Sequence, residues 1–201
     1  MRDMTLTSTV CAIALCVVVL HSRSTSEVID HSGFDLGSGN FGYIFTSPDV
    51  PPALRTFYVD AETGHDTADG LTPGSAWHTL QRANKVAQPG DRFLLRGTFR
   101  GQRLRPAASG TATHKIVYAA GDGPTPVLDA EGLEAMVQLD SLSHVVLDGL
   151  ELTGGEYIVQ LWGKASHIWL RNLYVHDSGG VLMKASSYNR VEDCRFERIG
   201  S

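Results

Sequence analysis

The residues best suited to chemistry in this chain of 201 residues stand in short polar turns between β-prone segments. His176 and Asp177 follow the apolar segment LYV, and Lys184 comes one turn later. A histidine, a carboxylate and an amine can together bind an anion or move a proton. The three side chains can therefore line a ligand groove. The simpler interpretation is a solvated turn, because polar residues commonly occupy turns.

Two histidines in similar surroundings suggest a shared cation. His144 and His167 stand 23 positions apart, each after a serine, in SHVVLDGLELTGG (143–155) and SHIWLRNLYVHDSGG (166–180). Protein zinc sites use three or four protein ligands, and no third ligand follows the same spacing. The pattern therefore favours histidines that stack at strand edges over a metal site.

An acidic loop has the composition of a calcium-binding loop. Carboxylate oxygens are the ligands that calcium prefers, but the loop lacks the twelve-position ligand order of an EF-hand. A solvated turn is the simpler interpretation. The loop contains Asp60, Glu62, Asp66 and Asp69, followed by Gly70.

Aromatic residues concentrate in the two similar segments and the stretch between them. Trp169 and Tyr174 occupy positions that the alternation of side chains places on an outer surface, where their rings could stack on sugars. Packing under the N-terminal arm or against a further domain explains them equally well. The full set is Tyr157, Trp162, Trp169 and Tyr174.

These residues need a scaffold, and an internal repeat indicates which one. The two similar segments are followed by a weaker copy, SYNRVEDCRFERIGS (187–201), in which Val191, Cys194 and Phe196 take the apolar positions. Short strands at a spacing of about 22 residues, without helices between them, are typical of a parallel β-helix. Equivalent residues of successive coils should form interior ladders, one of Leu147, Leu170 and Val191 and one of Leu152, Val175 and Phe196.

The segment before the repeats predicts a strand, a short helix and a second strand. The strands are expected in TFYVDA (56–61) and RFLLRGTFRG (92–101). Such a unit would cap the first coil, whose apolar end would otherwise be exposed. The predicted helix has Ser75 as its N-cap and one apolar stripe made of Trp77, Leu80, Ala83, Val86 and Ala87.

The beginning of the chain resembles a secretory signal. The apolar run 10–20 is too short for a membrane span, which needs about 20 residues. We therefore expect a secreted protein, extracellular or periplasmic, with no membrane contact after signal cleavage; a signal anchor is the alternative. The formal net charge of −5, without a run of Lys or Arg, argues against a nucleic-acid partner. The predicted domains are a signal peptide (1–26), a Gly/Ser/Pro-rich arm (27–55), a cap (56–112) and β-helix coils (113–201).

Cysteine usage excludes a disulfide framework in the mature chain. Cys11 and Cys16 lie inside the predicted signal, so only Cys194 would remain. One cysteine can form neither an intramolecular disulfide nor a cysteine-based zinc site. Cys194 falls in an apolar slot of the repeat and is interpreted as a small core residue.

Residues 56–201 resemble secreted right-handed parallel β-helix proteins of the pectate-lyase-like superfamily, most closely those of polysaccharide lyase family 9. The segment FYVDAETGHDTADGLTPGSAWHTLQRANKVAQPGDRFLLRGTFRG is similar to their opening, and VVLDGLELTGG to one of their coils. The resemblance implies an all-β solenoid that acts on an acidic polysaccharide, such as pectate, by calcium-assisted β-elimination. It carries over no catalytic residue and no calcium ligand, because those of the family lie on coils beyond Ser201.

Two other functions stay open on the sequence alone. One is a non-catalytic β-helix that binds glycans or serves as a surface or adhesion module. The other is a glycoside hydrolase, for which no convincing pair of carboxylates is present. The last coil ends without a capping segment, so we also expect that the chain is truncated at its C-terminus and that the open edge favours association.

Overall fold

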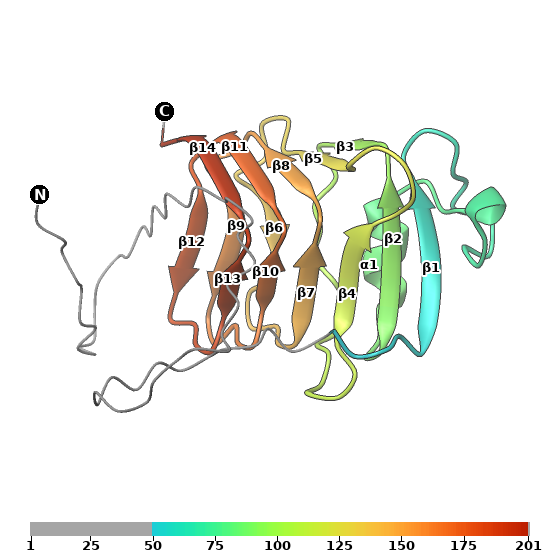
Figure 1. Cartoon of the computed structure of the whole chain (residues 1–201), viewed down its shortest axis with the longest axis horizontal. Helices are drawn as coiled ribbons and strands as arrows, with labels where there is room; N and C mark the ends of the chain where they lie inside the picture. The colour runs from blue at the N-terminus through green and yellow to red at the C-terminus, as the bar shows by residue number, and fades with distance from the viewer. Residues whose placement is uncertain (1–49, 201) are drawn as a thin grey trace, which may run out of the picture.

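Three parallel sheets run side by side along the molecule in a computed structural model that describes residues 50–200 (Figure 1). Sheet A contains β1 (Arg55–Asp60), β2 (Asp91–Arg96), β4 (Ile116–Ala120), β7 (Val145–Asp148), β10 (Trp169–Arg171) and β13 (Arg190–Glu192). Sheet B contains β3 (Thr98–Arg100), β5 (Val127–Asp129), β8 (Glu151–Thr153), β11 (Tyr174–Ser178) and β14 (Arg195–Ile199). Sheet C contains β6 (Ala135–Gln138), β9 (Tyr157–Trp162) and β12 (Val181–Lys184).

The chain visits the three sheets in a fixed order, C then A then B, and then begins the next coil. The coils β6–β7–β8, β9–β10–β11 and β12–β13–β14 follow one another in this way. Every strand pair is parallel and in direct register with its counterpart one coil away. The predicted right-handed parallel β-helix is confirmed.

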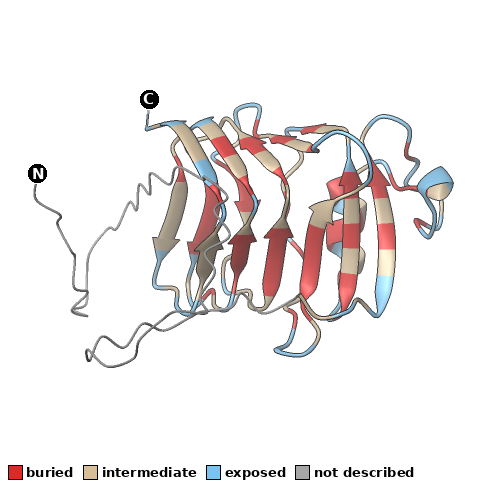
Figure 2. Cartoon of the chain, viewed as in Figure 1, coloured by how far each residue is buried: buried red, intermediate tan, exposed pale blue. Residues whose placement is uncertain are grey.

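The interior consists of ladders of equivalent side chains. Leu147, Leu170 and Val191 are register partners, as the repeat predicted. The same ladder continues through Phe57, Phe93 and Tyr118, whose rings stack with centroids 5.6 and 4.8 Å apart. Buried residues line the inside of all three sheets (Figure 2). The second predicted ladder, of Leu152, Val175 and Phe196, is also confirmed.

A column of left-handed residues makes the corner between sheets A and B. Gly149, Asn172 and Asp193 occupy equivalent turns with φ of 71°, 53° and 53°. Gly, Asn and Asp tolerate this conformation better than other residues do. The side-chain amide of Asn172 also donates to Asp148 at 2.7 Å, which ties one corner to the one before it.

The two Gly-Gly pairs of the repeat make the tight turn between sheets B and C. The amide of Gly179 donates to the carbonyl of Gly155 at 3.1 Å, so the two turns stack directly on each other. A Cβ on Gly179 would overlap the backbone carbonyl of Glu156. Glycine is therefore required at this position by close approach between coils.

The helix near β1 is shorter than predicted and has a different cap. α1 covers Leu80–Val86 with Thr79 as N-cap, and Trp77 precedes it. Ser75 instead ends the 3-10 helix η2 (Pro73–Ser75). The cause is Asp66, whose carboxylate accepts hydrogen bonds from the backbone and hydroxyl of Thr79 and so holds Thr79 extended just before the helix. Leu80 and Ala83 pack into the core, as predicted.

Several predicted boundaries fall outside the described residues. The signal peptide (1–26), with Cys11 and Cys16, and most of the arm (27–55) lie there. The division at 112/113 stays a prediction, because sheet A runs across it from β2 to β4 without interruption. No helix among residues 50–200 is long and apolar enough to cross a membrane.

Cys194 lies where the repeat placed it. It is buried in the core, and its thiol contacts the carbonyl oxygen of Leu170. Burial raises the pKa of this thiol, so the reactive thiolate is disfavoured.

Candidate functional site

An exposed tryptophan and a lysine lie next to each other on the outer face of sheet C. Trp162 ends β9 and Lys184 ends β12, and the two residues are register partners. Their neighbours Leu161 and Met183 pack into the core, so Trp162 and Lys184 point outward. Trp162 is 43% exposed, and the Lys184 ammonium lies 4.7 Å from the centroid of its ring.

Polar side chains continue this surface toward the earlier coils. Gln138 and Gln160 are register partners on the same face of sheet C. Gln138 accepts a hydrogen bond from Arg103 at 3.2 Å and donates one to Asp140 at 2.7 Å. An aromatic ring, an ammonium group and the partly exposed amide of Gln138 thus occupy one outer surface, whereas Gln160 is only 7% exposed. We call Trp162, Lys184 and Gln138 the sheet C surface.

The sheet C surface can bind a ligand that combines an apolar face with hydroxyl or carboxylate groups. The tryptophan ring offers a flat apolar area, and amides can donate to and accept from hydroxyl groups. The lysine ammonium can pair with a carboxylate.

The predicted trio of His176, Asp177 and Lys184 is not brought together. His176 and Asp177 lie on β11 in sheet B, whereas Lys184 lies in sheet C and contacts Trp162. The turn at Gly179 and Gly180 separates the two sheets, so a position one turn later in the sequence faces a different side of the solenoid. The predicted groove made of these three residues is therefore wrong.

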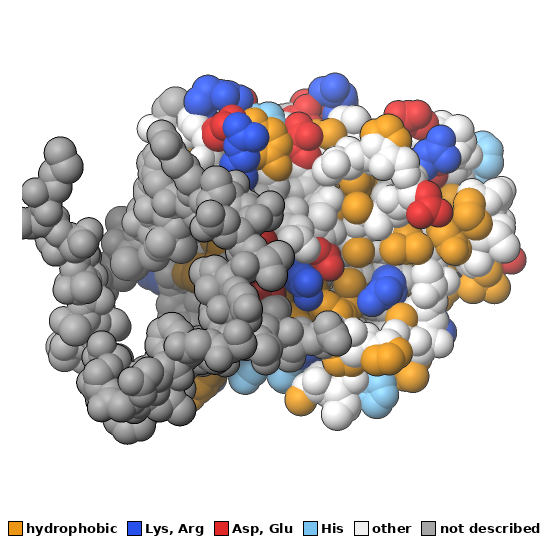
Figure 3. Space-filling model, viewed as in Figure 1, with side chains coloured by type: hydrophobic (Ala, Val, Ile, Leu, Met, Phe, Trp, Pro, Cys, Tyr) orange, Lys and Arg blue, Asp and Glu red, His pale blue; other side chains and the backbone are white. Residues whose placement is uncertain are grey.

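His176 instead belongs to a charged cluster on sheet B. Its Nδ1 lies 2.6 Å from Asp177 and its Nε2 lies 3.0 Å from Glu151 on the preceding coil. Arg198 on the following coil binds Asp177 through two nitrogen atoms. Figure 3 shows positive and negative side chains alternating along the edge of the molecule that sheet B forms. The sequence could have indicated Arg198, which stands one repeat after Asp177.

Electrostatics in this cluster favour charged side chains. Partial burial would lower the pKa of His176, but the hydrogen bonds with Asp177 and Glu151 outweigh it and raise that pKa above its usual 6.5. The guanidinium of Arg198 first, and then His176, hold the pKa of Asp177 well below its ordinary range.

His144 and His167 stack, as the sequence favoured. Their ring centroids are 4.6 Å apart, and Tyr188 of the next coil continues the stack at 5.2 Å. Burial, then the charge of Lys115, lowers the pKa of His144. Within residues 50–200 no group of three or more His, Cys, Asp and Glu side chains is placed to hold a metal ion.

The three aspartates of the acidic loop hold the loop and the start of α1 in place. Asp60 accepts from the amides of Glu62 and Thr63 and from the Thr63 hydroxyl. Burial would raise its pKa, but these hydrogen bonds outweigh burial and lower it. Asp66 binds Thr79, and Asp69 binds the Ser75 hydroxyl at 2.6 Å.

The two outward aromatic residues of the second repeat have different surroundings. Trp169 does lie on the outer side of sheet A, in a small cluster with Val117 and Val146, but it is only 8% exposed. The Lys115 ammonium lies 4.4 Å from its ring centroid. Of the two interpretations left open for Trp169, packing fits this burial better than stacking on sugars. Tyr174 donates to Glu197 at 2.7 Å and stacks on His176.

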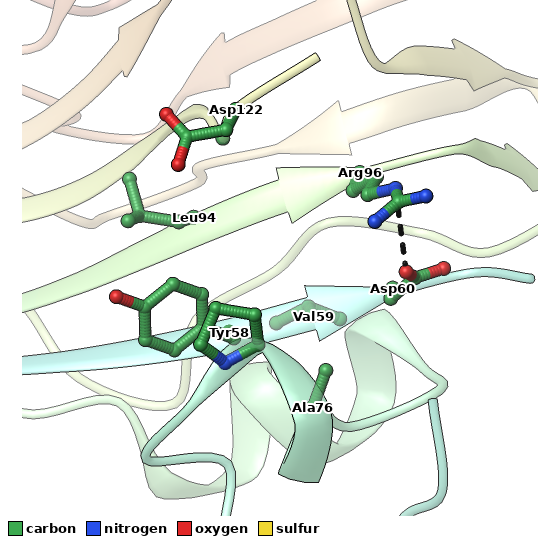
Figure 4. A pocket seen from close by; sticks show the side chains of 9 residues that line it. Tyr58, Val59, Asp60, Ala76, Leu94, Arg96 and Asp122 are labelled. Carbon is green, nitrogen blue, oxygen red and sulfur yellow. Dashed lines mark ion pairs between the residues drawn. The ribbon is translucent and has the colours of Figure 1, made fainter. Parts of the chain in front are cut away.

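A small pocket lies near the cap end of the outer face of sheet A (Figure 4). Tyr58, Leu94 and Asp122 border it, and Arg96 and Asp60 form an ion pair beside it. Its volume of about 60 Å³ corresponds to roughly two water molecules, whereas small-molecule pockets measure about 300–1,000 Å³. This pocket is too small to be the site.

The fold defines the class of protein, a right-handed parallel β-helix protein. No family model and no curated protein sequence matches the chain. Several solved structures, in contrast, are similar to the chain in fold. A GH136 lacto-N-biosidase from Eubacterium ramulus is similar over 73% of this chain and 35% of its own, with 21% identity and a TM-score of 0.62.

Two lyases are also similar in structure. Pectate lyase Pel9A matches 70% of this chain and 39% of its own, with 22% identity and a TM-score of 0.58. An alginate lyase from Paenibacillus sp. matches 71% of this chain and 44% of its own, with 25% identity and a TM-score of 0.53. The chain therefore spans less than half of the length of each of these proteins, and the likeness concerns the fold.

Proposed function

We propose that this protein binds an acidic polysaccharide on the sheet C surface. The pairing of Trp162 and Lys184 carries the proposal. A sugar ring can stack on the exposed indole, while its carboxylate pairs with the ammonium group beside that ring. The partly exposed amide of Gln138, on the same face, suits a hydroxyl group of a neighbouring sugar.

The similar structures support a polysaccharide ligand. Their names are those of lyases for pectate, alginate and rhamnogalacturonan, and of a lacto-N-biosidase. Pectate and alginate are polymers of uronic acids, which carry one carboxylate on each sugar. Lys184 favours such a ligand over a neutral one.

The finer proposal is cleavage of the polymer by β-elimination. This reaction removes the proton next to the uronate carboxylate, so it needs a base and a cation that neutralises the carboxylate. Calcium would serve as that cation in the family that the sequence resembles. The described residues do not fit a calcium ion, because no suitable group of carboxylates is present among them. A lyase would need calcium ligands from outside residues 50–200, so a non-catalytic binding module is the second candidate.

Substitutions in the sheet C surface test the binding proposal. We expect Trp162→Ala to weaken binding of an oligogalacturonate by about two- to tenfold, since aromatic contacts contribute about 0.5–1.5 kcal/mol. Isothermal titration calorimetry measures the change. Tyr188→Ala is the matched control, because Tyr188 is an aromatic residue that is 77% exposed but belongs to the ring stack with His167 and not to the sheet C surface. Equal affinity of Trp162→Ala and the unchanged protein would refute the proposed surface.

Lys184→Gln tests the choice of an acidic ligand. This substitution should lower the affinity for oligogalacturonate and make that affinity less dependent on salt concentration. The affinity for a neutral galactan oligomer should stay unchanged. Equal loss for both ligands would show that Lys184 does not select for the carboxylate.

An activity assay separates lyase from binding module. The protein is incubated with pectate and Ca²⁺, and unsaturated products are followed by ultraviolet absorbance. Absorbance that rises with time supports the lyase. Saturable binding without product supports the binding module.

A further inference from the structure

We propose that His176 is a pH-sensitive clasp that joins three successive coils on sheet B. The clasp consists of Glu151 on β8, His176 and Asp177 on β11, and Arg198 on β14. It lies on a different sheet from the proposed ligand surface and does not depend on it.

The geometry requires a protonated imidazole. Both ring nitrogens of His176 are within hydrogen-bond distance of a carboxylate, at 2.6 Å from Asp177 and 3.0 Å from Glu151. A carboxylate only accepts hydrogen bonds, and a neutral imidazole has a single N–H group. Neutral His176 could therefore satisfy one carboxylate only and would turn a lone pair toward the other.

The clasp reaches the next coil through Asp177. Arg198 donates to both oxygens of the Asp177 carboxylate, so the same side chain binds the imidazole and the guanidinium. Asp177 and Arg198 occupy equivalent left-handed positions, each with φ of 48°. The charge of His176 thus contributes to the contact between β11 and β14.

Further charged groups surround His176 on β14. Tyr174 stacks on the imidazole with ring centroids 4.5 Å apart. The register partner of His176 on β14 is Glu197. Glu197 accepts from Tyr174 and forms ion pairs with Arg195 and Arg198. On β8, the register partner of His176 is the uncharged Thr153. The surroundings are therefore two cations balanced against three carboxylates before His176 is counted.

The direction of the pH effect follows from this arrangement. Contacts with two carboxylates raise the pKa of His176 above 6.5. The stabilisation is fully present below about 6.5 and is lost as the pH rises through the raised pKa. The coil that contains β12, β13 and β14 should then open more often in mildly alkaline solution.

Hydrogen exchange of the full chain measures that opening. Exchange of the β14 amides, corrected for the intrinsic effect of pH, should speed up between pH 5.5 and 8.5 in the unchanged protein. The expected change is about tenfold for each unit by which folding raises the pKa. Amides of β2, which do not contact the clasp, should show no such change.

Three variants make the test specific. His176→Thr places the residue of the preceding coil at this position, so it should fold, and its β14 exchange should no longer depend on pH. Glu151→Gln leaves one carboxylate and should shift the transition to lower pH. His167→Asn removes a histidine of the ring stack, keeps a residue type that tolerates the left-handed backbone of this position (φ of 56°), and should keep the transition. A transition that persists in His176→Thr, or its absence from the unchanged protein, would overturn the proposal.

Nuclear magnetic resonance of the imidazole gives an independent readout. At pH 6 the two ring nitrogens of His176 should both carry protons, and the titration midpoint should lie above that of His144, whose pKa is lowered. A midpoint at or below that of His144 would also overturn the clasp.

Discussion

Gly179→Ala should destabilise this protein by about 3 kcal/mol or more, because overpacking of a close contact costs about that much when the backbone has to move. The new methyl group would overlap the carbonyl oxygen of Glu156 and come within 2.7 Å of its carbonyl carbon. Both atoms belong to the backbone of the preceding coil, so no side chain can rotate away. Chemical denaturation followed by circular dichroism measures the loss.

The matched control is Gly74→Ala. A methyl group at Gly74 would meet no atom within 4 Å. This change should alter the free energy of unfolding by less than about 0.5 kcal/mol, as surface substitutions usually do. If Gly179→Ala were as stable as Gly74→Ala, the coils could not be stacked as tightly at this turn as the structure shows.

Phe93→Ala should cost about 3–5 kcal/mol, the usual range for removing a buried phenylalanine. Phe93 is fully buried and is the middle ring of the stack between Phe57 and Tyr118. Its neighbours above and below are held by their own strands, so the cavity cannot collapse. Denaturant titration gives the change in unfolding free energy.

A second ring stack provides the comparison for Phe93. Tyr188 ends the stack of His144 and His167 on the outside of the solenoid and is 77% exposed. Tyr188→Ala should change stability by no more than about 0.5 kcal/mol. Similar losses for the two variants would contradict the division between interior and exterior ladders.

The fold was predictable because its signal repeats. Leu147, Leu170 and Val191 recur at the coil spacing, and each copy strengthens the same interpretation of the others. The Gly-Gly pair at 154–155 also recurs, at 179–180. The cap helix was less predictable, because its start depends on Asp66, which folds back from 13 residues earlier to bind Thr79.

The candidate site was harder to predict because it joins residues across coils. Trp162 and Lys184 are distant in the sequence and become neighbours only through the register of β9 and β12. Aligning the third copy with the second at Ser166 and Ser187 would have placed Met183, not Lys184, beside Trp162, so the alignment would have missed the pair by one residue. Burial of Trp169 was not predictable from alternation, which indicates the side of the sheet but not what lies against it.

The corner column of Gly149, Asn172 and Asp193 has a consequence for how such a protein can change. Because each corner repeats the same backbone shape, an outer side chain can be moved along the axis only by whole strand spacings of about 4.8 Å. Insertion or loss of one coil would displace every later side chain by that step and leave the interior ladders intact. A polymer that lies along the axis would then meet the same groups at a new, commensurate distance.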